Sequence, residues 1–220
     1  MYARLCRASP WLTVLLLLGC VESTERQSDM SDLRDPWTLS AVPEDPDLAA
    51  GQQVFGSCAS CHLADAGGRS DGTIPRLAGQ NALILERRLS ALLDDSIGLP
   101  VMTPFARALT PAEIGQVAAY LSSLPRPARV GFGTGREIAR GAEIYEERCL
   151  SCHAASGIGQ AALNAPRLCG QHAAYSLRRL NELAEPGIRV SDPAMSFVAA
   201  GLAPQDRRAV SDYLARLECN

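Results

Sequence analysis

The chain has 220 residues, enough for one large domain or two small ones of about 100 residues each. Hydrophobic residues make up 47% and charged residues 20%, a composition that favours a globular body over a disordered chain. The net charge of -3 gives no reason to expect nucleic-acid binding.

The first 20 residues have the features of an export signal. Arg4 and Arg7 precede an apolar run that is too short to cross a bilayer as a helix. The run ends in Leu-Leu-Gly-Cys, which resembles a bacterial lipobox, where a cysteine is lipidated and becomes the new N-terminus. We therefore expect residues 1–20 to be a lipoprotein-type signal peptide with the lipid on Cys20. An ordinary cleaved signal with an incidental cysteine is the alternative.

Residues 21–47 are polar, acidic and interrupted by three prolines. They show neither helical nor strand periodicity, so we expect a disordered acidic tether. A flexible chain of this length has an average reach of about 30 Å. Such a tether would hold a soluble body close to a membrane.

A Cys-x-x-Cys-His motif follows, formed by Cys58, Cys61 and His62. This spacing is the signature of covalent c-type haem attachment. Two thiols add across the haem vinyl groups, and the adjacent histidine becomes an iron ligand.

The remainder of the first half, to residue 124, favours helices. Residues 82–93 form one helical segment, and Thr110-Pro111-Ala112-Glu113 supplies an N-cap, a proline at the first position and a glutamate at the third for another. A single helical stripe follows it, made of Ile114, Val117, Ala118, Leu121 and Leu124. No alternating strand pattern of useful length is present.

The second half repeats the first. An offset of 91 residues carries the first motif onto Cys149, Cys152 and His153, and carries the Pro-Arg-Leu-Ala-Gly-Gln loop 75–80 onto 166–171. Further on, an offset of 93 aligns the last helices, where Ala203 replaces the N-cap threonine, so the second helix begins less firmly. We therefore expect domain 1 at 48–124, a Pro- and Gly-rich linker at 125–135 and domain 2 at 136–220.

Each haem iron needs a second axial ligand besides the motif histidine. Met102 and Met195 lie 40 and 42 residues after their histidines, once per repeat, in a loop-like stretch before the last helix. We interpret them as the sixth ligands, and core filling is the alternative. His172 competes for the second iron, but Asn81 takes its place in the first repeat, and we expect His172 to be an exposed residue at a helix start.

Pro75 and Pro166 both stand 13 residues after the ligand histidine of their repeat. Ligand histidines commonly donate their other ring N–H to a nearby acceptor. The carbonyl of this proline is a candidate acceptor, a role that the sequence permits without establishing it.

Together these features resemble the two-domain, dihaem class I cytochromes c, most nearly the cytochrome c4 family, over about residues 48–217. The resemblance implies an all-α fold of two tandem domains, each wrapped around one covalent haem c. It also implies methionine sixth ligands at Met102 and Met195, and carbonyl groups at Pro75 and Pro166 that accept a hydrogen bond from the haem histidines. One departure is local, because two residues separate Phe55 from its motif and three separate Tyr145 from its own.

Two cysteines, Cys169 and Cys219, lie outside the motifs of the expected mature chain. In an oxidising compartment they are a candidate disulfide. The first alternative is two unbonded cysteines, one small and buried and the other exposed at the frayed chain end. The second is a reactive Cys169, as in haem enzymes that oxidise sulfur compounds.

The prediction for function is a periplasmic, membrane-tethered electron carrier of a respiratory chain and not an enzyme, because two ligand-saturated haems leave no open iron position. The family resemblance implies a quinol oxidoreductase or dehydrogenase upstream and a terminal oxidase or reductase downstream. The alternatives are a cytochrome subunit of a periplasmic dehydrogenase and a dihaem sulfur-compound oxidoreductase. A soluble periplasmic protein is the alternative localisation.

Overall fold

The computed structural model describes residues 47–93, 99–186 and 193–219. The expected signal peptide, the lipid site Cys20 and the tether up to residue 46 lie outside the described residues. Within those ranges, no helix combines the length and the apolar character needed to cross a membrane.

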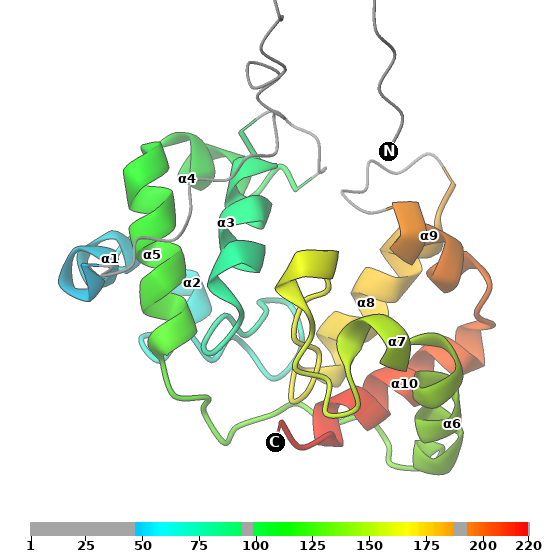
Figure 1. Cartoon of the computed structure of the whole chain (residues 1–220). Coiled ribbons are helices and arrows are strands. Elements are labelled where there is room, and N and C mark those ends of the chain that lie inside the picture. The colour runs from blue at the N-terminus through cyan, green and yellow to red at the C-terminus, as the bar shows by residue number, and fades with distance from the viewer. Residues whose placement is uncertain (1–46, 94–98, 187–192, 220) are drawn as a thin grey trace, which may run out of the picture. The chain divides into compact units, whose positions relative to one another are not determined.

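Both repeats are built from helices (Figure 1). The first repeat contains α1 (Leu48–Phe55), α2 (Ala59–His62), α3 (Ala82–Ser90), α4 (Thr103–Arg107) and α5 (Pro111–Ser123). The second contains α6 (Ile138–Arg148), α7 (Leu150–His153), the 3-10 turn η2 (Ala161–Leu163), α8 (Ala173–Ala184), α9 (Pro193–Ala200) and α10 (Pro204–Arg216). The described part of the chain has no strand, only an isolated bridge between Gln160 and Ala165, so the all-α prediction is confirmed.

The two last helices begin as their sequences predict. Thr110 accepts a hydrogen bond from the N–H of Glu113, whose carboxylate bonds back to Thr110, forming a capping box. Ala203 has no oxygen on its side chain, and α10 accordingly starts without a side-chain cap. The first and last helices of each repeat then cross in close contact.

A glycine makes each crossing possible. A Cβ on Gly51 of α1 would lie 2.2 Å from the carbonyl oxygen of Gln116 in α5. A Cβ on Gly141 of α6 would lie 2.3 Å from that of Ala209 in α10. Any larger residue would separate the helices that enclose the core of its repeat.

Each repeat has its own apolar core beside these crossings. The core of repeat 1 contains Phe55, Ala66, Ala78, Leu85, Val117, Ala118 and Leu121. The core of repeat 2 contains Ile144, Tyr145, Leu202, Ala209, Val210 and Leu214. The first and last helices also bring together equivalent ring pairs, with centroid distances of 5.8 Å for Phe55–Tyr120 and 5.6 Å for Tyr145–Tyr213.

The segment 125–135, expected as a linker, is bound to both repeats. The Arg76 guanidinium of repeat 1 donates to the carbonyl of Pro127 at 2.8 Å. The N–H of Gly133 donates to the buried carboxylate of Asp212 in α10 at 2.8 Å. The linker is therefore fixed along its length by side chains from either side.

The methionines differ from the expected loop-like setting. Met102 is the N-cap residue of α4, and Met195 lies inside α9. The expectation of a loop is wrong for Met195, because Pro193 starts a helix that the following Ala-Met-Ser-Phe-Val-Ala-Ala sequence continues.

Candidate haem sites

The attachment motifs sit on one-turn helices that follow the first helix of each repeat. Helix α1 ends at Phe55, and a turn separates it from Cys58, whereas α6 ends at Arg148 and leads directly into Cys149. The one-residue difference seen in the sequence is thus absorbed before the motif. From the first cysteine to the residue after the histidine the two sites have the same local structure, a one-turn helix followed by a residue with positive φ.

Both motif histidines are buried and oriented by a proline carbonyl. His62 is 5% exposed and His153 is 3% exposed. The Nδ1 atom of His62 lies 3.1 Å from the carbonyl oxygen of Pro75, and that of His153 lies 2.9 Å from that of Pro166. With the proton on Nδ1 donated to the carbonyl, Nε2 carries the lone pair that ligates a metal. Burial lowers the pKa of His62, which favours the neutral imidazole that metal binding needs.

A glycine shapes the loop that brings each proline to its histidine. Gly68 and Gly159 donate their N–H groups to the carbonyls of His62 and His153, at 3.0 and 2.9 Å. Both have positive φ, 69° and 78°. A Cβ on Gly159 would lie 2.6 Å from the carbonyl oxygen of Pro166, the acceptor of the histidine bond. Only glycine allows the backbone to approach this closely.

The two cysteines of each motif have different surroundings, one apolar and the other exposed. Cys58 and Cys149 pack against the apolar cores, while Cys61 and Cys152 are exposed. Two thiols, a buried imidazole and an apolar wall match the donors and faces of a haem c group. When bound, the haem supplies an iron that cycles between the ferrous and ferric states.

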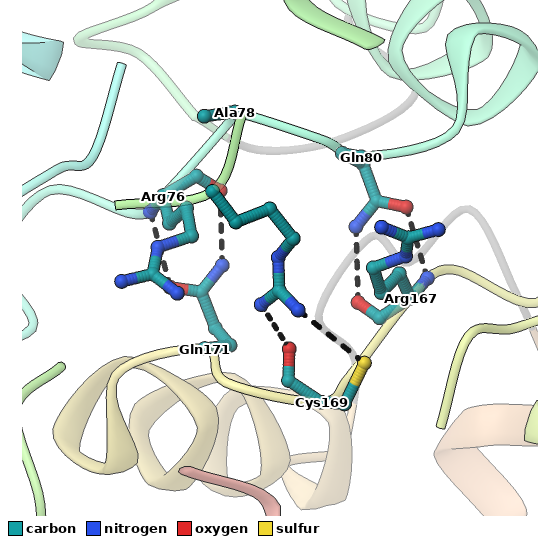
Figure 2. A pocket seen from close by; sticks show the side chains of 7 residues that line it. Arg76, Ala78, Gln80, Arg167, Cys169 and Gln171 are labelled. Carbon is teal, nitrogen blue, oxygen red and sulfur yellow. Dashed lines mark hydrogen bonds between the residues drawn. The ribbon is translucent and has the colours of Figure 1, made fainter. Parts of the chain in front are cut away.

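Three buried arginine nitrogens give a second test of this fit. Arg76, Arg126 and Arg167 line a cavity of about 10 Å³ between the repeats (Figure 2). Their Nε atoms are buried and have no acceptor among the described residues. Haem propionate carboxylates are acceptors of the kind these cations need, although the cavity itself has room for about one water molecule. The fit to two haem groups therefore rests on the paired thiols and the buried imidazole of each repeat.

The two candidate methionine ligands are half-buried. Met102 packs against a small cluster formed by Ala91, Leu92 and Ala106. Leu89 belongs to the surroundings of both this cluster and the core around Phe55. The helix α3 thus connects the surroundings of Met102 with the core that carries Cys58.

His172 is not the exposed residue that the sequence suggested. Its side chain is fully buried, with 0% exposure. Nδ1 accepts a hydrogen bond from the N–H of Gly131 at 3.0 Å, so Nε2 donates to the carbonyl of Gly67 at 2.9 Å. With both ring nitrogens bound to backbone groups, His172 joins the two repeats and the linker and leaves neither nitrogen for iron. The expectation was wrong because burial here depends on a partner 105 residues away.

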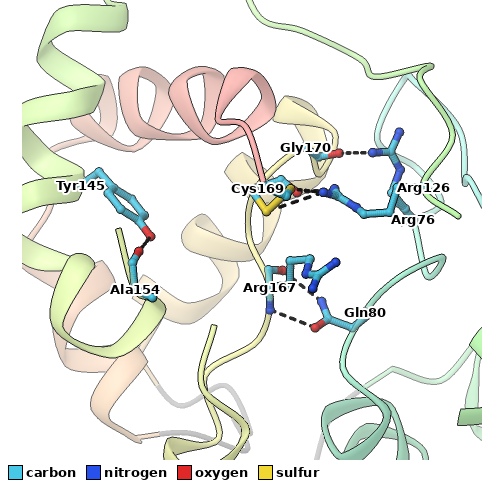
Figure 3. Close-up of a disulfide and its surroundings, with 9 residues drawn as sticks. Arg76, Gln80, Arg126, Tyr145, Ala154, Arg167, Cys169 and Gly170 are labelled. Atoms are coloured by element: carbon cyan, nitrogen blue, oxygen red, sulfur yellow. Dashed lines mark hydrogen bonds between the residues drawn. A yellow bond between two sulfur atoms is a disulfide. The ribbon is translucent and has the colours of Figure 1, made fainter. Parts of the chain in front are cut away.

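Cys169 and Cys219 are joined by a disulfide, with 5.5 Å between their Cα atoms. Cys169 is buried, and the Arg126 guanidinium donates to its carbonyl oxygen (Figure 3). The free cysteines of the described residues are the four of the haem motifs. A bonded, buried Cys169 does not offer the thiol that sulfur chemistry at this position would need.

Comparison with known proteins shows similarity to cytochromes c. The cytochrome c family model matches residues 48–125 and 138–218, once for each repeat. Cytochrome c4 of Pseudomonas aeruginosa is 33% identical over 78% of this chain and 89% of that protein. The crystal structure of reduced recombinant cytochrome c4 from Pseudomonas stutzeri matches with a TM-score of 0.70 and 28% identity, covering 79% of this chain and 100% of that one.

Two further matches carry another name. A protein of Stutzerimonas stutzeri named thiosulfate dehydrogenase electron acceptor is 36% identical over 73% of this chain and 79% of that protein. The structure of thiosulfate dehydrogenase TsdBA from Marichromatium purpuratum matches with a TM-score of 0.69 and 27% identity, covering 78% of this chain and 40% of that one.

The chain belongs to the cytochrome c family, as a dihaem class I member of the cytochrome c4 type. It binds two covalent haem c groups and is an electron carrier rather than an enzyme.

Proposed function

We propose that each repeat holds one haem through its two motif cysteines, with one histidine and one methionine as axial ligands. The ligand pairs are His62 with Met102 and His153 with Met195. The observation that carries this proposal is the matching contact of each buried histidine with Pro75 or Pro166, which directs Nε2 away from the loop in both repeats. Methionine ligation raises the reduction potential, which suits a carrier late in an electron-transfer chain.

Absorption spectroscopy of the oxidised holoprotein tests the ligand set. Met102→Ala and Met195→Ala should each remove about half of the weak near-infrared band that marks a sulfur–iron bond, if each of the two irons contributes equally. After reduction to the ferrous state, each variant should also bind carbon monoxide at one haem while the other stays closed. A wild-type protein that lacks the band, or that binds carbon monoxide readily, contradicts the proposed ligands.

For the N-terminal residues we propose a lipoprotein-type signal at 1–20, a lipid on Cys20 and a tether at 21–47 that holds domains 48–124 and 136–220 at the periplasmic face of a membrane. The supports are the apolar run ending in Leu-Leu-Gly-Cys and the polar, proline-interrupted segment after it. Cys20→Ala should move the protein from the membrane fraction to the soluble or unprocessed fraction. Unchanged membrane attachment would contradict the lipid site.

In its pathway, the protein takes electrons from a periplasmic donor and passes them to a terminal oxidase. A specific donor is favoured by the relatives named thiosulfate dehydrogenase electron acceptor, from Stutzerimonas stutzeri and Thiomonas intermedia. The disulfide at Cys169 supports the role of acceptor over that of a sulfur-oxidising enzyme.

Stopped-flow reduction of the ferric protein distinguishes these donors. A thiosulfate dehydrogenase supplied with thiosulfate should reduce both haems, and thiosulfate alone should reduce neither. The same measurement is made with a quinol–cytochrome c oxidoreductase supplied with quinol as the donor. Faster reduction by this donor assigns the protein to electron transfer from quinol. Reduction by thiosulfate alone would contradict the role of simple carrier.

A further inference from the structure

Two glutamine side chains connect the repeats in a reciprocal way (Figure 2). Gln171 of repeat 2 accepts from the N–H of Arg76 at 3.0 Å and donates to the carbonyl of Arg76 at 3.0 Å. Gln80 of repeat 1 accepts from the N–H of Arg167 at 2.9 Å and donates to the carbonyl of Arg167 at 3.0 Å. Each amide therefore binds the backbone of one arginine in the opposite repeat through both of its polar atoms.

Each of these arginines shares a peptide group with the proline that orients a haem ligand. The N–H of Arg76 and the carbonyl of Pro75 belong to one planar peptide unit, because Arg76 follows Pro75 directly. The carbonyl accepts from His62, while the N–H donates to Gln171. A hydrogen bond to the N–H of a peptide polarises its carbonyl and makes that oxygen a better acceptor.

The same sequence of contacts exists on the other side. Gln80 bonds to the N–H of Arg167, and the carbonyl of the same peptide unit, on Pro166, accepts from His153. One peptide group thus separates each ligand histidine from a side chain of the other repeat.

Both glutamines are held in place by their own repeat. Gly79, next to Gln80, donates its N–H to the carbonyl of Leu121 in α5 at 2.9 Å. Gly170, next to Gln171, donates to the carbonyl of Leu214 in α10 at 2.8 Å. Because each loop is bound to a core helix, a glutamine transmits the position of its own repeat to the arginine that it contacts.

We propose that Gln171 is a positioning residue for His62 and that Gln80 is a positioning residue for His153, so that each repeat tunes the reduction potential of the haem in the other. The inference rests on the proposed role of both histidines as iron ligands. A stronger acceptor for the ring N–H makes the imidazole a stronger donor to iron, which favours the ferric state. Removing the glutamine weakens that acceptor, so the potential of the opposite haem should rise.

The test is an NMR-monitored redox titration of the holoprotein, with each haem assigned through the ring protons of its own histidine. Gln171→Leu keeps a similar volume and should raise the potential of the His62 haem more than that of the His153 haem. Gln80→Leu should do the reverse. Gln53→Leu and Gln205→Leu are matched controls at exposed helix positions and should leave both potentials unchanged. Shifts confined to the mutated repeat, or equal in both, would overturn the proposal.

A second pair of variants keeps the test decisive if a leucine variant does not fold. Gln171→Glu and Gln80→Glu retain an acceptor oxygen for the arginine N–H and place a negative charge on it, while they lose the N–H that donates to the arginine carbonyl. The reduction potential of the haem in the other repeat should then fall. It should fall further than the potential of the haem in the repeat that carries the substitution. If the larger shift instead occurs at the haem of the substituted repeat, the glutamines are not positioning residues for the opposite histidine. A wild-type spectrum without histidine–methionine ligation would instead reject the proposed function, so the two failures are distinguishable.

Discussion

Replacing His172 with leucine should lower the free energy of unfolding by about 2–4 kcal/mol. The substitution keeps apolar volume but removes both ring hydrogen bonds, leaving the N–H of Gly131 and the carbonyl of Gly67 without partners. An unsatisfied buried polar group costs about 1–3 kcal/mol. Gly67 is buried, so it should bear the larger cost, and Gly131 is half-buried, so it should bear the smaller.

The matched control is the equivalent position of repeat 1. Asn81 is exposed, and its side chain caps α3 by accepting from the N–H of Leu83 at 3.0 Å. Asn81→Ala should cost about 1 kcal/mol, the usual value for a lost N-cap. Both variants are compared with wild type by urea unfolding of the holoprotein, followed by circular dichroism and by haem absorbance. If His172→Leu costs no more than Asn81→Ala, the reasoning about the inter-repeat contact is wrong.

The contribution of His172 should also depend on pH. Burial lowers its pKa, and the charges of Arg76 and Arg129 lower it further, against the opposing effects of its backbone acceptor Gly67 and of Asp71. The folded state therefore binds fewer protons than the unfolded state, whose histidine has a pKa of about 6.5. The contribution of His172 to the free energy of unfolding is complete when the pH is above this unfolded-state pKa, and it is lost as the pH falls below that value. The difference between wild type and His172→Leu should shrink from pH 7 to pH 5, by at most about 1.4 kcal/mol per pH unit.

Comparing wild type with His172→Leu removes the contribution of other buried titratable groups to the pH dependence of stability. Burial raises the pKa of Glu86, which alters stability in acid in the same way in both proteins. A difference that stays constant with pH would show that His172 does not titrate in this range.

A glycine substitution with its control and a double cysteine substitution test the local structure. Gly159→Ala should displace the Pro166 carbonyl, because a Cβ there meets Pro166 at 2.5 Å. With His153 as the proposed iron ligand of repeat 2, this should raise the potential of the haem in that repeat in a redox titration. Gly115→Ala in α5 is the control, since nothing lies within 4 Å of its added Cβ, and it should stabilise the protein by up to about 1 kcal/mol. Replacing both Cys169 and Cys219 with serine opens a covalent loop of 50 residues and should cost about 2–4 kcal/mol in the same unfolding assay. Two free thiols in the unreduced, alkylated mature protein would contradict the disulfide.

The parts of the fold that the sequence predicts are those with local causes. The helix start at Thr110 needs only a hydroxyl, a proline and a glutamate at adjacent positions, and α5 begins there. The missing cap at Ala203 follows from the same rule. The position of each proline carbonyl 13 residues after its histidine was a candidate from spacing alone, and the structure places both within hydrogen-bond distance.

The parts that sequence reasoning missed depend on contacts between the repeats. Nothing near His172 in the sequence indicates burial, because its partners belong to the loop at Gly67 and to the linker at Gly131. Both glutamines were visible as a repeated Pro-Arg-Leu-x-Gly-Gln loop. A polar residue repeated in both loops was a signal of a shared contact, but its partner could not be read without the arrangement of the two repeats.

The contact between the repeats combines a symmetric part with an asymmetric one. A two-fold contact requires that residue i of one copy meets residue j of the other and that j meets i. Arg76 with Gln171 and Arg167 with Gln80 satisfy that condition. His172 breaks it, because it bonds to the linker and to repeat 1, while the equivalent Asn81 only caps its own helix. Two haem sites with matching histidine contacts therefore sit in different outer surroundings, and we expect them to have different reduction potentials for that reason.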